Sequence, residues 1–435
     1  MRPQVLYCGP SNKSVDVVAA YLKKFPNISV VRVYSEQIER KDFPIPGVPG
    51  LVSKWSRKES SMPVEMKDIA LHHLIRMRGK PHAAELAGYE RKFRTRPDSI
   101  SPQSIKDYKS TILEATKEEL QNHHIVLSTC NAAGARRISR LTRVIQVIVD
   151  EAGMCSEPET MIPLVSVKPN QVVLVGDHQQ LRSIITEPNA KQLGMDISLL
   201  EKYKDKAKML TIQYRMHEQI CEFPSSAFYD NKLETAESVR RRSLDPIRRI
   251  WPNNGNTPRV FCHVNGQEET LSVKTEEGNE QSKSNGAEIK HVMRMVRALI
   301  SMKVSPAEII ILSQYRLQCA QIEERLQKDR DRRLQQVKVS TVVKSQGSEW
   351  DYVIFSTVRS KPRIEIEEKP SRGWQRKHLG FINDENQMNV ALTRAKRGLI
   401  IIGNQYLLRC HQRWKEMLKK YQSTQCLVEA KDFLM

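Results

Sequence analysis

Ten short apolar runs, rich in Val and Ile, recur along the chain and constrain its fold more than any other feature. Such runs are typical of parallel strands, because crossover helices cover both faces of a parallel sheet and remove the alternation of polar and apolar residues. The ten runs are Val5–Cys8, Ser29–Tyr34, His124–Ser128, Val144–Val149, Gln171–Val175, Arg259–Val264, Glu308–Leu312, Val337–Val342, Tyr352–Thr357 and Leu399–Ile402. Five precede residue 206 and five follow it, which predicts an α/β fold with two stacked parallel-sheet units.

Residues 1–205 are therefore expected to form the first domain and residues 206–435 the second. Between about residues 36 and 122 no strand-like run occurs, and charged, helix-prone stretches such as Ser110–Gln121 predict a helical insertion in the first domain.

Three further stretches are expected at the surface. Residues 239–252 are dense in Arg and Pro, and residues 266–286 are mostly polar, so both are predicted to be surface loops. Residues 324–336 carry many charges at helical spacing, which indicates a solvated helix face.

The charge balance favours a polyanionic partner. Lys and Arg number 70 against 50 Asp and Glu, so the formal net charge is +20 and the sequence pI is about 9.6. Nucleic acid is the first candidate. No apolar run approaches the roughly 18–20 residues that cross a bilayer, so the sequence predicts no membrane-spanning helix and no membrane partner. The eight cysteines lack the paired spacing of zinc sites and are expected to be reduced thiols in the cytoplasm or the nucleus.

An acid pair follows one of the buried runs. Val144–Val149 ends in Asp150 and Glu151, and the carboxyl end of a parallel strand is where open α/β sheets bind ligands. Asp150 can hold Mg²⁺, and Glu151 can orient and deprotonate a water for attack on a γ-phosphate. Taken alone, the pair is more typical of a solvated turn or a helix N-cap.

Polar clusters also follow the next run and recur later in the chain. Gly176–Leu181 leaves its strand through a glycine, and its polar side chains can sense phosphate beside the acid pair. In Gln213–His217, Tyr214 offers a ring for base stacking and Arg215 a guanidinium suited to phosphate oxygens, although an amphipathic helix start with a surface arginine is the alternative.

Two more clusters complete the series. Ser345–Glu349 places Gly347 and Glu349 after a strand, where a ribose hydroxyl can be held. Asn389–Lys396 places Arg394 on a helix just before another buried strand. Five such clusters in this order make coincidence a poor explanation.

Together these segments resemble the motor motifs of superfamily 1 helicases. They are most similar to the Upf-like branch, which contains the nonsense-mediated-decay helicase and the helicases with zinc finger domains. Pro10–Asp16 resembles the first nucleic-acid-contact motif of that family, Asp150–Ala152 its Walker B motif and Gly176–Leu181 its phosphate-sensing motif. The three later clusters resemble its later motor motifs.

The resemblance implies an ATP-dependent motor with two RecA-like domains, the second an AAA-type helicase C-terminal domain. ATP and Mg²⁺ are the implied cofactors, with ATP in the cleft between the domains. By resemblance, Asp150 binds Mg²⁺, Glu151 is the catalytic base and Gln180 couples to the γ-phosphate, while Arg215 and Arg394 act as arginine fingers. The residues that it places against the nucleotide are Asp177, Gln213, Tyr214 on adenine, Gly347, and Glu349 on the ribose.

Single-stranded nucleic acid is the implied partner, with RNA expected and DNA the alternative. The residues that the resemblance places against it are Pro10, Ser11, Asn12, Thr341 and Thr393. Movement from 5′ to 3′ is likewise implied by the family.

A phosphate-binding loop of the Gly-x-x-x-x-Gly-Lys-Ser/Thr type does not occur in the sequence. Gly79-Lys80 is followed by Pro81, which supplies neither a hydroxyl for Mg²⁺ nor a free N–H. We expect the chain to be a fragment whose missing N-terminal segment holds this loop, with strand edges exposed by its loss, and to be inactive as an ATPase alone. The competing hypothesis is a nucleic-acid-binding protein that does not hydrolyse ATP.

Two dipeptides depart from the family pattern. Gly153-Met154 stands where a small polar residue and Gln are more usual, and Asn386-Gln387 stands where two basic residues often occur.

Overall fold

The computed structural model describes residues 3–46, 62–96, 100–241, 247–255, 257–275 and 278–433. The chain divides into two compact units. The first consists of Met1–His178 and Arg182–Ala207, and the second of Gln179–Leu181 and Lys208–Met435. Among the described residues, every helix is too short or too polar to cross a lipid bilayer.

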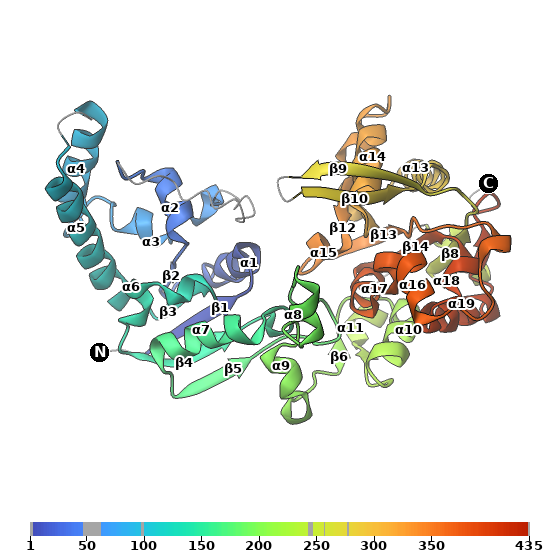
Figure 1. The fold of residues 1–435 in the computed structure, drawn as a ribbon, viewed down its shortest axis with the longest axis horizontal. Coiled ribbons are helices and arrows are strands. Elements are labelled where there is room, and N and C mark those ends of the chain that lie inside the picture. Colours follow the sequence, from blue (N-terminus) through green and yellow to red (C-terminus); the bar gives the residue numbers. More distant parts are fainter. Residues whose placement is uncertain are drawn as a thin grey trace. The chain divides into compact units, whose positions relative to one another are not determined.

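The first unit is built on a five-stranded sheet in the order β2-β3-β1-β4-β5 (Figure 1). Its strands are β1 (Gln4–Gly9), β2 (Val30–Arg32), β3 (Ile125–Thr129), β4 (Val144–Val149) and β5 (Gln171–Leu174). All neighbouring pairs are parallel, and the register sets Leu6 opposite Val126 of β3 and Val147 of β4. The five strands predicted for this half of the chain are therefore confirmed.

Both faces of this sheet are covered around β1 and β3. Leu6 and Cys8 belong to a buried cluster that includes Leu86 and Tyr108 of the insertion helices, whereas Tyr7 packs on the opposite face with Val15 of α1 (Asn12–Leu22). Because both sets of alternate side chains are buried, the strands lose the polar alternation of a half-exposed sheet. The other helices of this unit are α2 (Glu36–Asp42), α3 (Leu71–Leu74), α4 (Ala83–Thr95), α5 (Pro102–Gln121), α6 (Arg136–Ser139), α7 (Glu157–Val167), α8 (Pro188–Gln192) and α9 (Leu199–Lys202).

Strand β5 ends the sheet order and has exposed apolar side chains. Val172 is 45% exposed and Val173 is 37% exposed. Because neighbouring side chains of a strand point to opposite faces, both faces of β5 are partly exposed.

The second unit contains a six-stranded parallel sheet in the order β12-β11-β13-β14-β8-β15, of which β12, β13, β14 and β8 are labelled in Figure 1. Its strands are β8 (Arg259–His263), β11 (Ile309–Ser313), β12 (Lys338–Thr341), β13 (Trp350–Ser356), β14 (Ala395–Gly403) and β15 (Leu427–Glu429). The five strands predicted here are confirmed. Strand β15 was not predicted, because three residues are too short to form a recognisable apolar run.

Helices cover this second sheet on both faces. Val292, Val296 and Leu299 of α13 (Gly286–Ser301) pack with Ile311 and Ile354 of the sheet. On the other face Phe355 stacks with the fully buried Trp414 of α19 (Gln412–Ser423), at 6.3 Å between ring centroids. The remaining elements are β6 (Ile212–Gln213), α10 (Glu218–Phe228), β7 (Glu234–Thr235), α11 (Glu237–Arg240), α12 (Pro252–Gly255), α14 (Arg316–Gln327), α15 (Val342–Ser345), α16 (Arg372–Leu379), α17 (Glu385–Leu392) and α18 (Gln405–Leu408).

Two predicted surface loops are corrected by the structure. Most of residues 266–286 forms an antiparallel hairpin, β9 (Glu269–Thr275) and β10 (Gly278–Ser284). The prediction was wrong because backbone pairing stabilises a polar hairpin, and the alternation in β9 was overlooked. Within 239–252, the side chains of Ile247 and Trp251 are each 3% exposed and belong to the core, while residues 242–246 lie outside the described residues.

The predicted solvated helix over residues 324–336 is also shorter than expected. Helix α14 ends at Gln327, and Leu334 further on is buried in the core. The charged stretch therefore contains the end of α14 and a following loop, and Leu334 of this loop packs into the core of the second unit.

A buried polar network holds the end of β13 in the second unit. Glu288, fully buried at the start of α13, accepts hydrogen bonds at Oε2 from the Ser356 hydroxyl (2.6 Å) and from the Val358 N–H (2.9 Å). The Asn285 amide donates to the Val358 carbonyl at 3.0 Å. Val358 has a φ of 70°, a costly conformation for a β-branched residue, so these bonds offset local backbone strain.

Glu288 predicts a specific pH dependence of stability. Burial raises its pKa from 4.5 to about 8, although hydrogen bonds from Ser356 and Val358 oppose the rise. The folded unit therefore retains a proton that the unfolded chain releases, so stability is full below about pH 4.5 and falls as pH rises to about 8. We expect Glu288→Gln to remove this fall, which amounts to roughly 5 kcal/mol at most.

The measurement is urea unfolding between pH 5 and pH 8.5, followed by tryptophan fluorescence, since Trp251, Trp350, Trp374 and Trp414 all lie in the second unit. Glu324→Gln, at an exposed glutamate of α14, serves as the control and should keep the wild-type fall. An unchanged slope in Glu288→Gln contradicts the assignment.

Candidate functional site

Asp150 and Glu151 follow the carboxyl end of β4, and neighbouring groups orient the Asp150 carboxylate. The Tyr7 hydroxyl of β1 donates to Asp150 Oδ2 at 2.5 Å, and the Glu151 N–H donates to Asp150 Oδ1 at 2.9 Å. Burial raises the pKa of the Tyr7 hydroxyl, and the Asp150 carboxylate raises it further, so the hydroxyl remains a donor. Glu151 has a φ of 51°, in the left-handed region, so the chain turns sharply between the two acids.

Two glycines allow the loops after β4 and β5 to pack backbone against backbone. A Cβ at Gly153 would lie 2.7 Å from the Asp177 carbonyl oxygen, and a Cβ at Gly176 would lie 2.8 Å from the Ala152 nitrogen. The Ala152 N–H donates to the Val175 carbonyl at 2.8 Å. Asp177 thus lies at the same sheet edge as Asp150 and Glu151. The close approach of the Asp177 carbonyl also explains why a glycine, which departs from the family pattern, occupies position 153.

Pro10, Ser11 and Asn12 form the turn between β1 and α1 in the first unit. The Ser11 side chain caps α1 by accepting from the Ser14 N–H at 3.2 Å. Asn12 Oδ1 accepts from Arg32 Nη2 at 2.7 Å. Ser11 is exposed, whereas Asn12 is partly occupied in holding the buried Arg32.

In the second unit, the three later sequence clusters meet around Arg215. Its Nε donates to Glu349 Oε2 at 2.6 Å, and its Nη1 donates to the Thr393 carbonyl at 3.0 Å. Lys396 Nζ lies 3.0 Å from the other Glu349 oxygen. Burial alone would raise the pKa of Glu349, but the hydrogen bonds from Arg215 and Lys396 lower it below its ordinary value.

Arg394 lies beside this group and is almost completely buried, with 1% of its surface exposed. Its Nη2 donates to Gln180 Oε1 at 3.0 Å and its Nε to the Val390 carbonyl at 3.1 Å. The prediction that Arg394 lies on a helix is wrong: α17 ends at Leu392, Thr393 is its C-cap, and Arg394 occupies the turn before β14. This turn directs the guanidinium sideways, toward the Gln180 segment.

Asparagines of α17 fix the Gln179–Leu181 segment, which groups with the second unit. Asn389 Nδ2 donates to the Gln179 carbonyl at 2.9 Å, and Asn386 Nδ2 donates to the Gln180 carbonyl at 2.5 Å. Asn386 stands where the family often has a basic residue, and here its amide holds the backbone that presents Gln180.

The other predicted nucleotide residues differ in how accessible they are. Gln213 uses its amide internally: Nε2 donates to the Met216 carbonyl and Oε1 accepts from the Arg215 N–H, which shapes the turn below Arg215. Tyr214 is 64% exposed, as a stacking platform requires. Gly347 has a φ of 74°, which explains a glycine there.

The two predicted nucleic-acid threonines of the second unit serve local structure. Thr341 caps α15 by accepting from the Lys344 N–H at 3.4 Å. Thr393 is 4% exposed, and its hydroxyl donates to the Asn389 carbonyl at 2.8 Å. The structure therefore does not present the Thr393 hydroxyl at the surface.

Sequence reasoning missed Tyr7, Lys396 and the two asparagines as parts of these groups. Tyr7 lies inside an apolar run. A buried tyrosine hydroxyl usually has a hydrogen-bond partner, so the tyrosine itself was the signal in the sequence that could have indicated one. Lys396 and Asn389 were inside a recognised motif, but their partners lie 47 and 210 residues away along the chain.

Comparisons with known proteins bear on the identity of these groups. Two protein-family profiles, each described as an AAA domain, match residues 1–188 and 195–406. The human "3'-5' exoribonuclease HELZ2" is 42% identical over 431 residues, which cover 98% of this chain and 15% of that protein. The Schizosaccharomyces pombe "ATP-dependent helicase upf1" is 32% identical over 432 residues, which cover 98% of this chain and 42% of that protein.

The chain belongs to the Upf-like branch of the superfamily 1 helicases. Its matched part is a helicase motor region, and it spans less than half the length of these two relatives. Among solved structures, an arterivirus nonstructural protein 10 helicase in complex with DNA covers 96% of this chain and 57% of its own, at 12% identity and a TM-score of 0.36.

As in other superfamily 1 helicases, the fold is α/β with two parallel sheets of RecA-like type. The helicase motifs of the first unit supply the carboxylates of Asp150 and Glu151, and those of the second unit supply the guanidinium groups of Arg215 and Arg394. The first set suits a metal-bound phosphate, and the second suits phosphate oxygens.

Proposed function

We propose that this chain is the motor region of an ATP-dependent RNA helicase that couples ATP hydrolysis to translocation on single-stranded RNA. The observation that carries the proposal is that, within the second unit, Arg215 pairs with Glu349 and with the Thr393 carbonyl, while the next residue, Arg394, contacts Gln180. Four sequence segments converge there, and each belongs to a motif of the helicase family.

In the first unit, Asp150 is the proposed Mg²⁺ ligand and Glu151 the proposed base. The residues fit a hard cation, because Asp150 offers a carboxylate whose position is set by Tyr7 and by the Glu151 N–H. Magnesium bound there supplies charge neutralisation at the phosphates. Glu151, on the turn beside it, orients a water and accepts its proton.

In the second unit, Arg215 and Arg394 are the proposed arginine fingers, and Gln180 relays the state of the γ-phosphate. A hydrogen bond joins the Arg394 guanidinium to the Gln180 side chain, so a movement of one side chain displaces the other. Asp177, Gln213, Tyr214, Gly347 and Glu349 complete the proposed nucleotide contacts.

RNA is the proposed nucleic acid. The chain is basic and has few aromatic residues, so it is expected to bind RNA mainly through the phosphates. The net charge of +20 favours phosphate contacts, whereas aromatics make up 6% of residues, so stacking has a smaller share. The matched relative named as an exoribonuclease also favours RNA. DNA remains the alternative to be compared in the same assay.

The second candidate function is nucleic-acid binding without hydrolysis. The absence of Gly-x-x-x-x-Gly-Lys-Ser/Thr from the 435 residues favours it for this chain taken alone. Without the loop, neither its backbone N–H groups nor its lysine contact the phosphates, so the 435-residue chain is expected to show negligible ATPase activity.

Glu151→Gln tests the motor proposal. The assay protein is a fusion in which the phosphate-loop segment of a relative precedes this chain. We expect Glu151→Gln to lower the RNA-stimulated turnover of ATP by about 10²–10⁴-fold, because Gln orients water but accepts no proton. Glu157→Gln, on α7 and paired with Lys202, is the matched control and should retain turnover. Equal turnover in Glu151→Gln and the parent fusion refutes the assigned base.

A further inference from the structure

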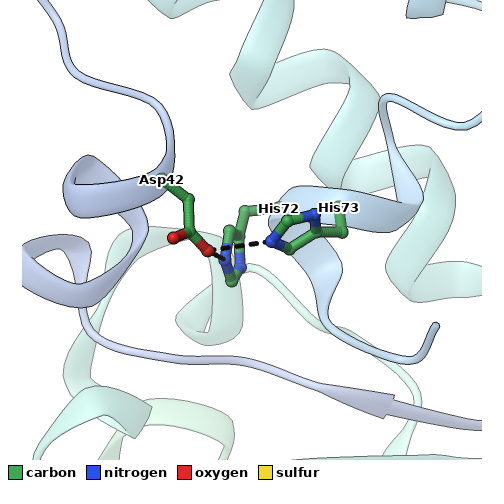
Figure 2. A group of neighbouring side chains, drawn as sticks. All are labelled: Asp42, His72 and His73. Atoms are coloured by element: carbon green, nitrogen blue, oxygen red, sulfur yellow. Dashed lines mark hydrogen bonds and ion pairs between the residues drawn. The ribbon is translucent and has the colours of Figure 1, made fainter. Parts of the chain in front are cut away.

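A histidine and carboxylate cluster lies in the first unit, away from the helicase motifs. Asp42, the last residue of α2, faces His72 and His73 of α3 (Figure 2). Asp42 Oδ2 lies 3.3 Å from His72 Nε2 and 2.9 Å from His73 Nε2. Among the described residues, this is the one group of three His, Cys, Asp or Glu whose ligand atoms all lie within 4.8 Å of one another.

These distances are close to those of a first coordination shell. In a tetrahedral site with bonds of about 2.0–2.1 Å, ligand atoms stand about 3.3 Å apart. The donor set is two imidazole nitrogens and one carboxylate oxygen, which suits zinc, whereas the all-oxygen sets of magnesium and calcium are excluded. We propose that Asp42, His72 and His73 bind one zinc ion.

A second carboxylate stands behind His72 in the position that metal-binding histidines use. Glu39 Oε1 lies 3.8 Å from His72 Nδ1, and both atoms are buried without a hydrogen-bond partner in the described structure. When Nε2 binds a metal, Nδ1 carries the proton and can donate it to such a carboxylate. Arg137 Nη1 donates to the other Glu39 oxygen at 2.6 Å, so this carboxylate is already held in place.

The cluster also has an open side for a fourth ligand. His72 is 3% exposed, but the Asp42 side chain is 35% exposed. Beside it lies a cavity of about 360 Å³ whose lining includes Glu39, Phe43, His72 and Arg76. A water from this side can complete the tetrahedron. The zinc ion then joins α2 to α3 and clips the first turns of the helical insertion to one another.

The competing explanation is a metal-free polar contact, in which both imidazoles donate hydrogen bonds to Asp42. The two explanations differ in metal content and in the role of Glu39. A hydrogen-bonded contact binds no zinc, and it makes no use of the Glu39 Oε1 and His72 Nδ1 pair.

The experiment is zinc titration of the full 435-residue chain after chelator treatment, by calorimetry and by elemental analysis. We expect one zinc per chain, lost in Asp42→Asn and in His73→Ala. Glu39→Gln should keep the stoichiometry but weaken zinc binding about 10–100-fold, as loss of a carboxylate behind a metal-binding histidine typically does. His123→Ala is the matched control, because His123 pairs with the single carboxylate of Glu119 at 3.0 Å, and it should bind zinc as the parent does.

Thermal unfolding gives a second readout that does not depend on any enzymatic activity. Zinc at about 100 times its Kd should raise the Tm of the first unit by roughly 5–10 °C in the parent chain and not in Asp42→Asn. Circular dichroism of each variant without zinc verifies that it is folded. Absence of stoichiometric zinc in the parent chain, or undiminished binding in folded Asp42→Asn and His73→Ala, overturns the proposal.

Discussion

Replacing Arg394 by alanine should remove nearly all ATP turnover, by about 10³–10⁵-fold, while nucleotide affinity changes little. The reason is that an arginine finger acts on charge that develops on the transferring phosphoryl group, which the ground state does not yet carry. The measurement compares kcat with the nucleotide Kd in the fusion that supplies a phosphate loop.

The buried position of Arg394 requires a structural control. Its guanidinium also binds Gln180 Oε1 and the Val390 carbonyl, so alanine could loosen the second unit. Arg397→Ala, three residues on in β14 and paired with Asp351 at 3.1 Å, removes a neighbouring arginine and should keep most turnover. If Arg394→Ala loses nucleotide binding but retains kcat at saturation, the finger assignment is wrong.

Binding of single-stranded RNA to the 435-residue chain should fall steeply with salt. If about six to ten phosphates are contacted, affinity drops by roughly 10²–10⁴-fold between 50 and 200 mM salt, because released counterions drive binding to single strands. The net charge of +20 and the small aromatic share make this the dominant contribution. Fluorescence anisotropy at several salt concentrations gives the slope directly.

The same titration distinguishes single-stranded RNA from single-stranded DNA and from duplex RNA, which the net charge of the chain does not. Single-stranded DNA and duplex RNA of equal length are the comparison ligands, and we expect single-stranded RNA to bind most tightly at every salt concentration. An affinity that does not change with salt contradicts a phosphate-dominated interface. A preference for the duplex contradicts the single-strand proposal.

The strands were predictable because a buried parallel strand consists of consecutive, mostly apolar residues. Val144–Val149 is apolar except for Gln146, and Ile309–Leu312 is apolar throughout; each became a parallel strand in the interior of its sheet. The hairpin of β9 and β10 was missed because backbone pairing, rather than an apolar face, accounts for its formation. Trp251 was missed because its burial depends on Gly398 leaving space for its ring.

The candidate site was predictable residue by residue but not contact by contact. Asp150, Arg215, Glu349 and Arg394 each stood in a recognised motif. Their contacts were not predictable: Tyr7 approaches Asp150 from a strand 143 positions earlier, and Arg215 pairs with Glu349 across 134 positions. The burial of Thr393 was also not predictable from its motif. The cluster of Asp42, His72 and His73 has no recognised ligand spacing, because a 30-residue gap separates the acid from the imidazoles.

The sequence by itself determined the two parallel-sheet units, the order of the motifs and the helicase family, because local apolar patterns and short motifs reside in neighbouring residues. Only the tertiary structure decided which side chains meet. Arg394 reaches Gln180, and Glu39 stands behind His72, because chain reversals bring together residues whose separation in sequence carries no information about distance in space.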